Sequence, residues 1–175
     1  MKTIAKEPAI RETVSETAKS LQENYPSVEL AYPIAIASYE TALKRLDALD
    51  NRVQTLMTFA ATVMLAVPAV AANKGLSFKS GWFITALVLF LIANAFGIAA
   101  RLRGHICLLS PETLYNEYLG LSEWEFKKDA IYWAGVNFKH NNNLILHRHR
   151  LMVMMLIFFL LEVEALAVWV AATLS

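Results

Sequence analysis

Apolar positions gather in three runs along this 175-residue chain, at 53–72, 81–100 and 151–173. The first two runs contain no charged residue. A helix needs about 20 mainly apolar residues to cross a bilayer, and all three runs reach that length. A soluble chain this short has too few amphipathic elements to cover three such helices in a core. The pattern therefore predicts three transmembrane helices.

The third run holds two glutamates near its centre, Glu162 and Glu164. On insertion scales each central acid costs about 2.5–3.5 kcal/mol, whereas each Leu, Ile, Phe or Val returns about 0.3–0.6 kcal/mol. The favourable insertion free energy of the apolar residues in the run nearly balances the cost of the two acids. We therefore expect the run to insert if the two acids are neutral or find partners in a helix bundle.

The distribution of Lys and Arg predicts the orientation of the chain. Residues 1–52 and 101–150 hold seven each, and the short segment 73–80 holds two. Because cytoplasmic loops carry the excess of Lys and Arg, the N-terminus and residues 101–150 should be cytoplasmic, and the C-terminus should be outside. Trp82 and Trp169 fit the outer interface, where Trp is enriched.

Two helices are predicted before the first run. Residues 8–24 place apolar residues at helical spacing, and Pro26 and Pro33 then break the pattern. From Ser38 an apolar seam continues into the first run without a breaker. We expect one long helix whose seam packs on another helix, because too few cations flank it for a membrane-surface helix. The seam consists of Tyr39, Leu43, Leu46, Leu49 and Val53.

A second long helix is predicted between the second and third runs. Ser122, with Glu125 three residues later, forms a capping box that starts a helix. One helix face then repeats every three or four positions into the third run, and no proline interrupts it. This face consists of Phe126, Ala130, Trp133, Asn137, His140, Leu144, His147 and Leu151. Gly135 and the three asparagines at 141–143 weaken this helix and allow a kink. We expect the two long helices to form a cytoplasmic stalk or bundle.

The two central glutamates should face different neighbours. Because they lie two residues apart, they point about 200° apart on a helix and cannot form one acid pair. Glu164 shares its face with Leu160 and two alanines, and small residues let helices approach closely in lipid. We therefore expect Glu164 to face the bundle or a symmetry axis. We expect Glu162 to bond to a hydroxyl such as that of Thr58 or Thr62.

Two interpretations of these acids stay open. They could form a ring of carboxylates in an oligomer, lining a path for cations. They could instead be neutral acids that join helices by hydrogen bonds. Asn94, which shares a small-residue face with Gly97 and three alanines of the second run, is grouped with them as a pore-lining or interhelical polar residue.

A basic collar is predicted at the inner membrane surface, where the second run ends and the third begins. The pattern favours topology determinants that touch lipid phosphates. A phosphate-binding site for a nucleotide signal is the alternative, because Arg clusters suit phosphate. The collar consists of Arg101, Arg103, His147, Arg148 and Arg150. His147 and His149 point to opposite helix faces, so no metal site is expected.

The composition agrees with a membrane protein, since 57% of the residues are apolar and the net charge is only +1. This balance gives no footprint of nucleic-acid binding. The single cysteine, Cys107, excludes a disulfide within the chain, and the first residues lack the apolar core of a signal peptide. No phosphate loop, nucleophile elbow, zinc-protease motif or dinucleotide fingerprint is present. We therefore expect neither an enzyme nor a cofactor.

The layout of residues 38–172 adds a resemblance to a known family. A helix ending in "LKRLDALDNRVQTLM" leads into the first run, and a helix with "EFKKDAIYWAGVNF" feeds the last run. This order resembles the small bacterial transmembrane effectors of nucleotide-signalled antiphage systems, the Pycsar-type transmembrane effectors. The resemblance implies an oligomer that breaches the bacterial inner membrane after a signal from a nucleotide second messenger. No separate cyclic-nucleotide-binding domain is visible, so the cytoplasmic helices or a partner protein would receive that signal.

The sequence therefore predicts an all-α membrane protein with three transmembrane helices, N-terminus inside and C-terminus outside. Its parts are a cytoplasmic helical N-terminal region (1–52), a transmembrane hairpin (53–100), a cytoplasmic helical region (101–150) and a third transmembrane helix (151–173). We expect a homo-oligomer in contact with membrane lipids, because three helices cannot easily bury both acids in one copy. The function expected first is that of a channel-like effector.

Two other functions are weighed against it. A non-conducting membrane scaffold would dock a partner protein through its cytoplasmic helices. A proton-coupled transporter is disfavoured, because three helices show no internal repeat.

Overall fold

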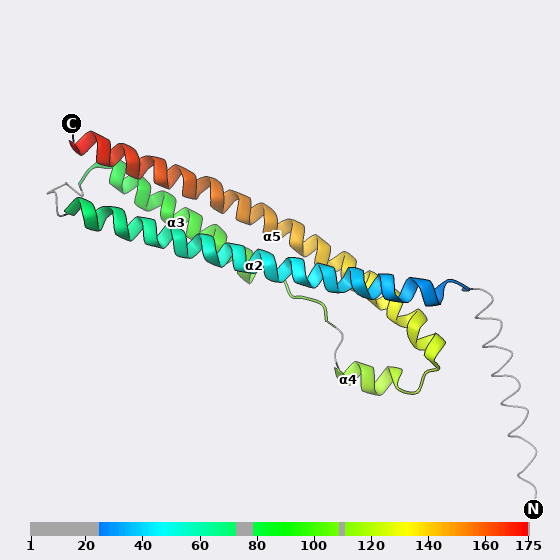
Figure 1. Cartoon of the computed structure of the whole chain (residues 1–175). Helices are drawn as coiled ribbons and strands as arrows, with labels where there is room; N and C mark the ends of the chain where they lie inside the picture. Colours follow the sequence, from blue (N-terminus) through cyan, green and yellow to red (C-terminus); the bar gives the residue numbers. More distant parts are fainter. Residues whose placement is uncertain (1–24, 73–78, 109–110, 175) are drawn as a thin grey trace, which may run out of the picture. The chain divides into compact units, whose positions relative to one another are not determined.

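The computed structural model describes residues 25–72, 79–108 and 111–174, and every regular element within them is helical (Figure 1). Three long helices account for most of this part of the chain: α2 (Val28–Ala72), α3 (Gly81–Leu102) and α5 (Glu123–Leu174). Each contains a stretch long and apolar enough to cross a membrane. The expectation of an all-α protein with three such helices is confirmed. The helix expected at 8–24 lies outside the described residues.

The helix α2 has 45 residues, which makes it about 67 Å long at 1.5 Å per residue. This is far more than the hydrocarbon core of a bilayer requires. As predicted, it continues into the first apolar run without a break. The predicted start was wrong, however, because α2 begins at Val28 and includes Pro33. Pro26, by contrast, does precede the helix, and the carbonyl of Ser27 accepts hydrogen bonds from the first helical turn.

Packing explains why Pro33 does not break α2. Proline removes one backbone hydrogen bond to the preceding turn, and next to it the Tyr32 ring packs at 6.5 Å from that of Phe126 on α5. The carboxylate of Glu29, one turn earlier, pairs with Lys127 at 2.7 Å. These contacts from α5 hold the first turns of α2 and override the local preference.

The helix α5 has 52 residues and begins at the predicted capping box. The backbone N–H of Ser122 donates to the Glu125 carboxylate at 3.1 Å, and the Glu125 N–H donates to the Ser122 hydroxyl at 3.3 Å. The helix continues through Gly135 and through Asn141 into the third apolar run. A short helix, α4 (Pro111–Thr113), runs into one π-helical turn (Leu114–Tyr118) before α5 begins.

The described residues form two compact units, to each of which α2 and α5 contribute. Unit 1 consists of residues 25–41 and 108–138, and unit 2 of residues 42–107 and 139–174, without the undescribed positions. Aromatic pairs join α2 to α5 within unit 1, the closest being Tyr39 and Trp133 at 4.8 Å between ring centroids. The expected membrane boundaries at 52/53, 100/101 and 150/151 stay predictions.

In unit 2, α3 packs between α2 and α5 through its small residues. The buried positions of α3 are Ala86, Ala93, Gly97 and Ala100, so the predicted small-residue face is the packing face. A Cβ added at Gly97 would lie 2.9 Å from Met57 Sδ on α2 and 3.1 Å from Met155 Sδ on α5. Small side chains allow this close approach, which supplies most of the attraction between helices in lipid.

The apolar core of unit 2 contains Trp169, whose ring is fully buried and lies 5.0 Å from that of Phe83. The Trp169 ring is therefore not exposed to lipid or water within one copy, and its expected depth at the outer interface stays a prediction. Its indole is enclosed by neighbouring helices, because the last turns of α5 pack on α2 and α3 in one cluster. Trp82 is half exposed, and its place at the interface stays a prediction.

Candidate functional site

The two glutamates of the third apolar run lie on opposite sides of α5. Glu162 is fully buried inside unit 2, whereas Glu164 is exposed on its surface. Of the two positions expected for Glu164, the interior of its own helix bundle is therefore wrong, and a symmetry axis between copies stays a prediction. Its neighbours Ala165 and Leu166 occupy the buried positions instead, because the inward stripe of α5 runs through Phe159, Glu162, Ala165, Leu166 and Trp169.

Glu162 lies on α5 between two groups of apolar core residues, one around Met155 and one around Trp169. Neither of its carboxyl oxygens has a hydrogen-bond partner among the described residues. The expected bond to Thr58 or Thr62 is absent. Both hydroxyls instead donate to carbonyls of their own helix, at 3.0 and 2.8 Å, because a helical threonine readily bonds to the carbonyl four residues earlier.

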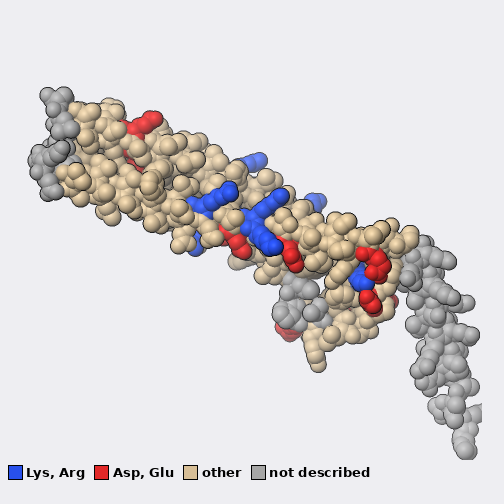
Figure 2. Space-filling view, viewed as in Figure 1, with Lys and Arg blue, Asp and Glu red and all other residues tan. Residues whose placement is uncertain are grey.

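Glu164 lies on a surface that is otherwise apolar. Leu160, Leu161 and Val168 surround it on α5 with 41–53% of their surfaces exposed. In Figure 2 a red acidic patch lies on the largely tan surface towards the carboxyl end of α5. A carboxyl group facing lipid at this position would cost several kcal/mol, of the order of the 2.5–3.5 kcal/mol given by insertion scales. In a membrane, Glu164 would therefore need a polar neighbour or water, and the described residues of one copy show no hydrogen bond to its carboxyl group.

A second exposed polar surface lies on α2. A groove there is lined by Asn51, Gln54, Thr55, Thr58, Phe59 and Thr62, and we call it the α2 polar groove. These residues recur every three or four positions, so they share one side of the helix. The hydroxyls of Thr55, Thr58 and Thr62 all donate to carbonyls of α2. Sequence reasoning noticed Thr58 and Thr62 singly and missed the stripe, although its spacing was readable.

Asn94, the third polar residue singled out from the sequence, lies half-buried on α3. Its side-chain amide donates to the Phe90 carbonyl of the same helix at 2.9 Å. This bond uses one N–H group of the amide within α3, so the contact that the structure describes does not join two helices.

The collar residue Arg148 has a different role from the one expected. It is only 4% exposed, and its Nη1 donates to both carboxylate oxygens of Asp50 on α2, at 2.9 and 3.0 Å. Its Nε donates to the Arg103 carbonyl at 3.1 Å, and its Nη2 lies 3.4 Å from the carbonyls of Arg101 and Gly104. Arg148 thus caps the C-terminus of α3, where a cation is favourable, and has no group left for lipid or nucleotide phosphate.

The segment after α3 is held against α5 by further polar contacts. The buried side chain of Asn141 accepts a bond from the Cys107 N–H at 3.1 Å and donates to the Cys107 carbonyl at 3.3 Å. Nε2 of His140 lies 3.3 Å from the His105 carbonyl. The asparagine run, which was expected to weaken the helix, thus holds the segment after α3 against α5. Only the tertiary structure reveals this, because no local pattern pairs residues 34 positions apart.

The other collar residues are exposed on unit 2 and keep their side chains available. They are Arg101, Arg103, His147 and Arg150. Among the residues that the structure describes, no group of three His, Cys, Asp or Glu side chains is placed to hold a metal ion. These four collar residues therefore remain candidates for binding the phosphate of a lipid or a ligand.

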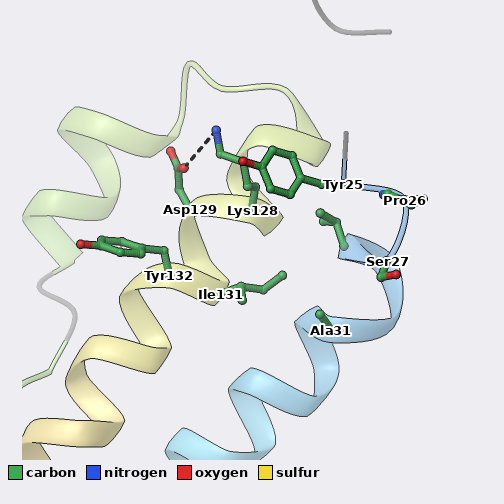
Figure 3. Close-up of a pocket in the computed structure, with 9 residues that line it drawn as sticks. Tyr25, Pro26, Ser27, Ala31, Lys128, Asp129, Ile131 and Tyr132 are labelled. Atoms are coloured by element: carbon green, nitrogen blue, oxygen red, sulfur yellow. Dashed lines mark ion pairs between the residues drawn. The ribbon is translucent and has the colours of Figure 1, made fainter. Parts of the chain in front are cut away.

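Unit 1 has a pocket of its own, of about 610 Å³. Figure 3 shows that the first turns of α2 and the start of α5 line it, with Ala31 and Ile131 among its apolar residues and Tyr25 and Tyr132 around it. Lys128 and Asp129 form an ion pair there at 3.7 Å. The pocket is mainly apolar.

Charged groups at the start of α5 are stabilised by their neighbours. Hydrogen bonds from the side chain and backbone of Ser122 lower the pKa of Glu125 below its ordinary value of 4.5. The Glu123 and Glu29 carboxylates, which accept hydrogen bonds from Lys127, raise the pKa of that lysine to about 12. These interactions lie on the surface of unit 1 and fix the beginning of α5.

Comparison with protein families, with curated proteins and with solved structures gives no significant match for this chain.

Proposed function

We propose that the protein is a multi-pass membrane protein that assembles from several copies and makes its membrane permeable. The observation that carries this proposal is the exposed carboxyl group of Glu164 on the apolar surface of unit 2. A lone chain in lipid would leave this group without a favourable environment. Assembly removes the cost when Glu164 faces the other copies, where it lines or gates a path for ions.

The orientation belongs to the same proposal. The Lys and Arg counts favour a cytoplasmic N-terminus and a cytoplasmic segment 101–150, with the C-terminus outside. The resemblance to antiphage effectors adds the bacterial inner membrane as location and a nucleotide second messenger as activating ligand. The exposed collar residues Arg101, Arg103, His147 and Arg150 are available to bind its phosphates, directly or together with a partner protein.

The proposal is tested by ion flux through phosphatidylethanolamine–phosphatidylglycerol vesicles that contain the purified protein, with and without a panel of cyclic nucleotides. Glu164→Gln removes the charge at nearly constant shape and should change the flux severalfold while the oligomer persists. Glu162→Gln is the matched control on the same helix, because its side chain is enclosed within one copy. Flux that is absent in every condition, or equal in wild type and Glu164→Gln, would contradict the role given to Glu164.

A non-conducting scaffold is the second candidate function. The pocket of unit 1 favours it, because a mainly apolar hollow flanked by the exposed Tyr132 is suited to a protein side chain. A partner recovered with wild type and lost with Ile131→Asp, together with vesicles that do not leak, would support this function over the first.

A further inference from the structure

Unit 2 exposes two polar surfaces within its apolar segments, and they complement each other. The first is the α2 polar groove, whose threonine hydroxyls donate hydrogen bonds to carbonyls of α2. Each hydroxyl oxygen keeps lone pairs that can accept a further hydrogen bond, and each hydroxyl can also rotate to donate. The groove thus offers both kinds of partner to an incoming group.

The second surface is the Glu164 carboxyl on α5. It is exposed beside Leu160 and Val168, with apolar side chains around it. A carboxyl group can accept hydrogen bonds when ionised and can also donate one when protonated. In either state a hydroxyl-lined groove is a suitable partner, whereas the carboxylate of another Glu164 offers only acceptors when both groups are ionised.

The packing of α2 on α5 shows that the two surfaces lie at nearly the same depth. The rings of Phe59 and Phe159 lie 5.7 Å apart, and Asp50 pairs with Arg148 at 2.9 Å. The two helices therefore run parallel, and each residue of α2 lies level with the residue of α5 that comes 98 to 100 positions later in the chain. By the phenylalanine pair, Glu164 is level with Met64, only two residues from Thr62, which is about 3 Å along the axis.

Equivalent residues of different copies share one depth in a bilayer, because the same apolar segments position each copy. The Glu164 carboxyl of one copy and the Thr62 hydroxyl of another can therefore meet without tilting either chain. The two surfaces belong to different helices, so one copy can offer them to two different neighbours. Such a heterologous contact repeats from copy to copy and forms a ring when the rotation closes, whereas a twofold dimer would pair both surfaces of the same two copies.

We propose that the Glu164 carboxyl of one copy occupies the α2 polar groove of a neighbouring copy and hydrogen-bonds to Thr62 there. This inference rests on the proposed function in requiring several copies, and it names the surface through which they meet. It assigns Glu164 to the boundary between subunits, from which it gates the path when neighbouring copies separate.

The test is disulfide trapping between two single-cysteine chains in a Cys107→Ser background. Thr62→Cys and Glu164→Cys are purified separately, mixed, reconstituted in phosphatidylethanolamine–phosphatidylglycerol vesicles and oxidised. We expect dimers in the mixture and few with either chain alone. A chain that carries both cysteines should give a ladder of larger species.

Val88→Cys is the matched control for Thr62→Cys. Val88 is half exposed on α3 and follows Ala86, which packs in the same cluster as Met64, so its depth is similar but its surface is different. Disulfide trapping between Val88→Cys and Glu164→Cys should be weak. Equal trapping with Val88→Cys, trapping of Glu164→Cys with itself, or monomers throughout would overturn the proposed contact.

A second measurement avoids cysteines in case these variants fold poorly. Thr62→Val keeps the shape of the side chain and removes the hydroxyl, so self-association in vesicles should weaken about threefold to tenfold, the range typical of one polar bond between membrane helices. Glu164→Gln, which still bonds to hydroxyls, should weaken it less than Glu164→Leu. Unchanged self-association in Thr62→Val and Glu164→Leu would refute the contact.

The outcomes separate this contact from the proposed function. Specific trapping in vesicles that never leak would retain the contact and reject the permeabilising activity. Leakage that depends on Glu164 without trapping at Thr62 would retain the activity and reject the contact.

Discussion

Replacing Arg148 by methionine should destabilise the protein more than any other change in the basic collar. The buried guanidinium joins Asp50 of α2 to the C-terminal carbonyls of α3, so it ties together all three long helices within unit 2. Methionine keeps most of the apolar stem but donates no hydrogen bond. Asp50 and the carbonyls of Arg101, Arg103 and Gly104 would each lose this partner.

The magnitude follows from the burial of the two partners. Removing one member of a buried ion pair costs about 3–5 kcal/mol. The Asp50 side chain is 35% exposed and can regain water, which places Arg148→Met nearer about 2–3 kcal/mol. Asp50→Asn should cost about 1 kcal/mol, because Arg148 keeps its bonds to the α3 carbonyls and the asparagine oxygen still accepts.

Thermal unfolding in detergent micelles, followed by tryptophan fluorescence, measures this difference. At about 2–4 °C per kcal/mol for a chain of this size, Arg148→Met should lower the midpoint by on the order of 5–10 °C. Arg150→Met is the matched control, since Arg150 is exposed two residues away and should shift stability by no more than about 0.5 kcal/mol. Equal midpoints for the two variants would refute the cap that we assign to Arg148.

Three further predictions concern single positions. Gly104→Ala should cost more than about 1 kcal/mol in the same melt, because Gly104 has φ +81° and a Cβ would lie 2.5 Å from Leu144 Cδ1; an unchanged midpoint would contradict this geometry. Glu162→Met should raise stability by about 1–3 kcal/mol, since the buried carboxyl has no hydrogen-bond partner among the described residues; a lower midpoint would reveal a partner. The Ser122–Glu125 capping box lowers the pKa of Glu125. It should therefore stabilise the start of α5 above pH 4.5, and this stabilisation should be lost as the pH falls through the lowered pKa. Hydrogen exchange of the Ser122 amide at several pH values measures this, and Glu125→Gln should remove the pH dependence.

The helices themselves were largely readable from local pattern. The capping box at Ser122 placed the start of α5, and uninterrupted apolar spacing indicated that both long helices continue into the membrane-length runs. The main error of local prediction was to end the helical pattern at Pro33. The free-energy cost of a proline inside α2 is offset by contacts with residues of α5 that lie some 90 positions away in the chain. Propensity describes one segment at a time and cannot weigh such contacts.

The polar residues were harder to place than the apolar ones. The angle between Glu162 and Glu164 followed from helical geometry, but which of them points inward depended on how α5 is rotated against its neighbours. Glu162 shares the inward stripe with the large Trp169 and Leu166. The small residues beside Glu164 suggested the opposite, because small side chains favour close packing without showing which helix supplies the partner.

Spacing and hydropathy along the chain were enough to predict three helices long and apolar enough for a bilayer, the place of the two acids within the third, and the small-residue face of α3. These are local properties, which can be read one segment at a time. The packing of the helices was needed to show that Arg148 caps α3 beside Asp50, that the Asn141 side chain bonds to Cys107, and that Glu164 rather than Glu162 is exposed. Each of these depends on the rotation and register of one helix against another, and these are set by side-chain packing between residues far apart in the chain.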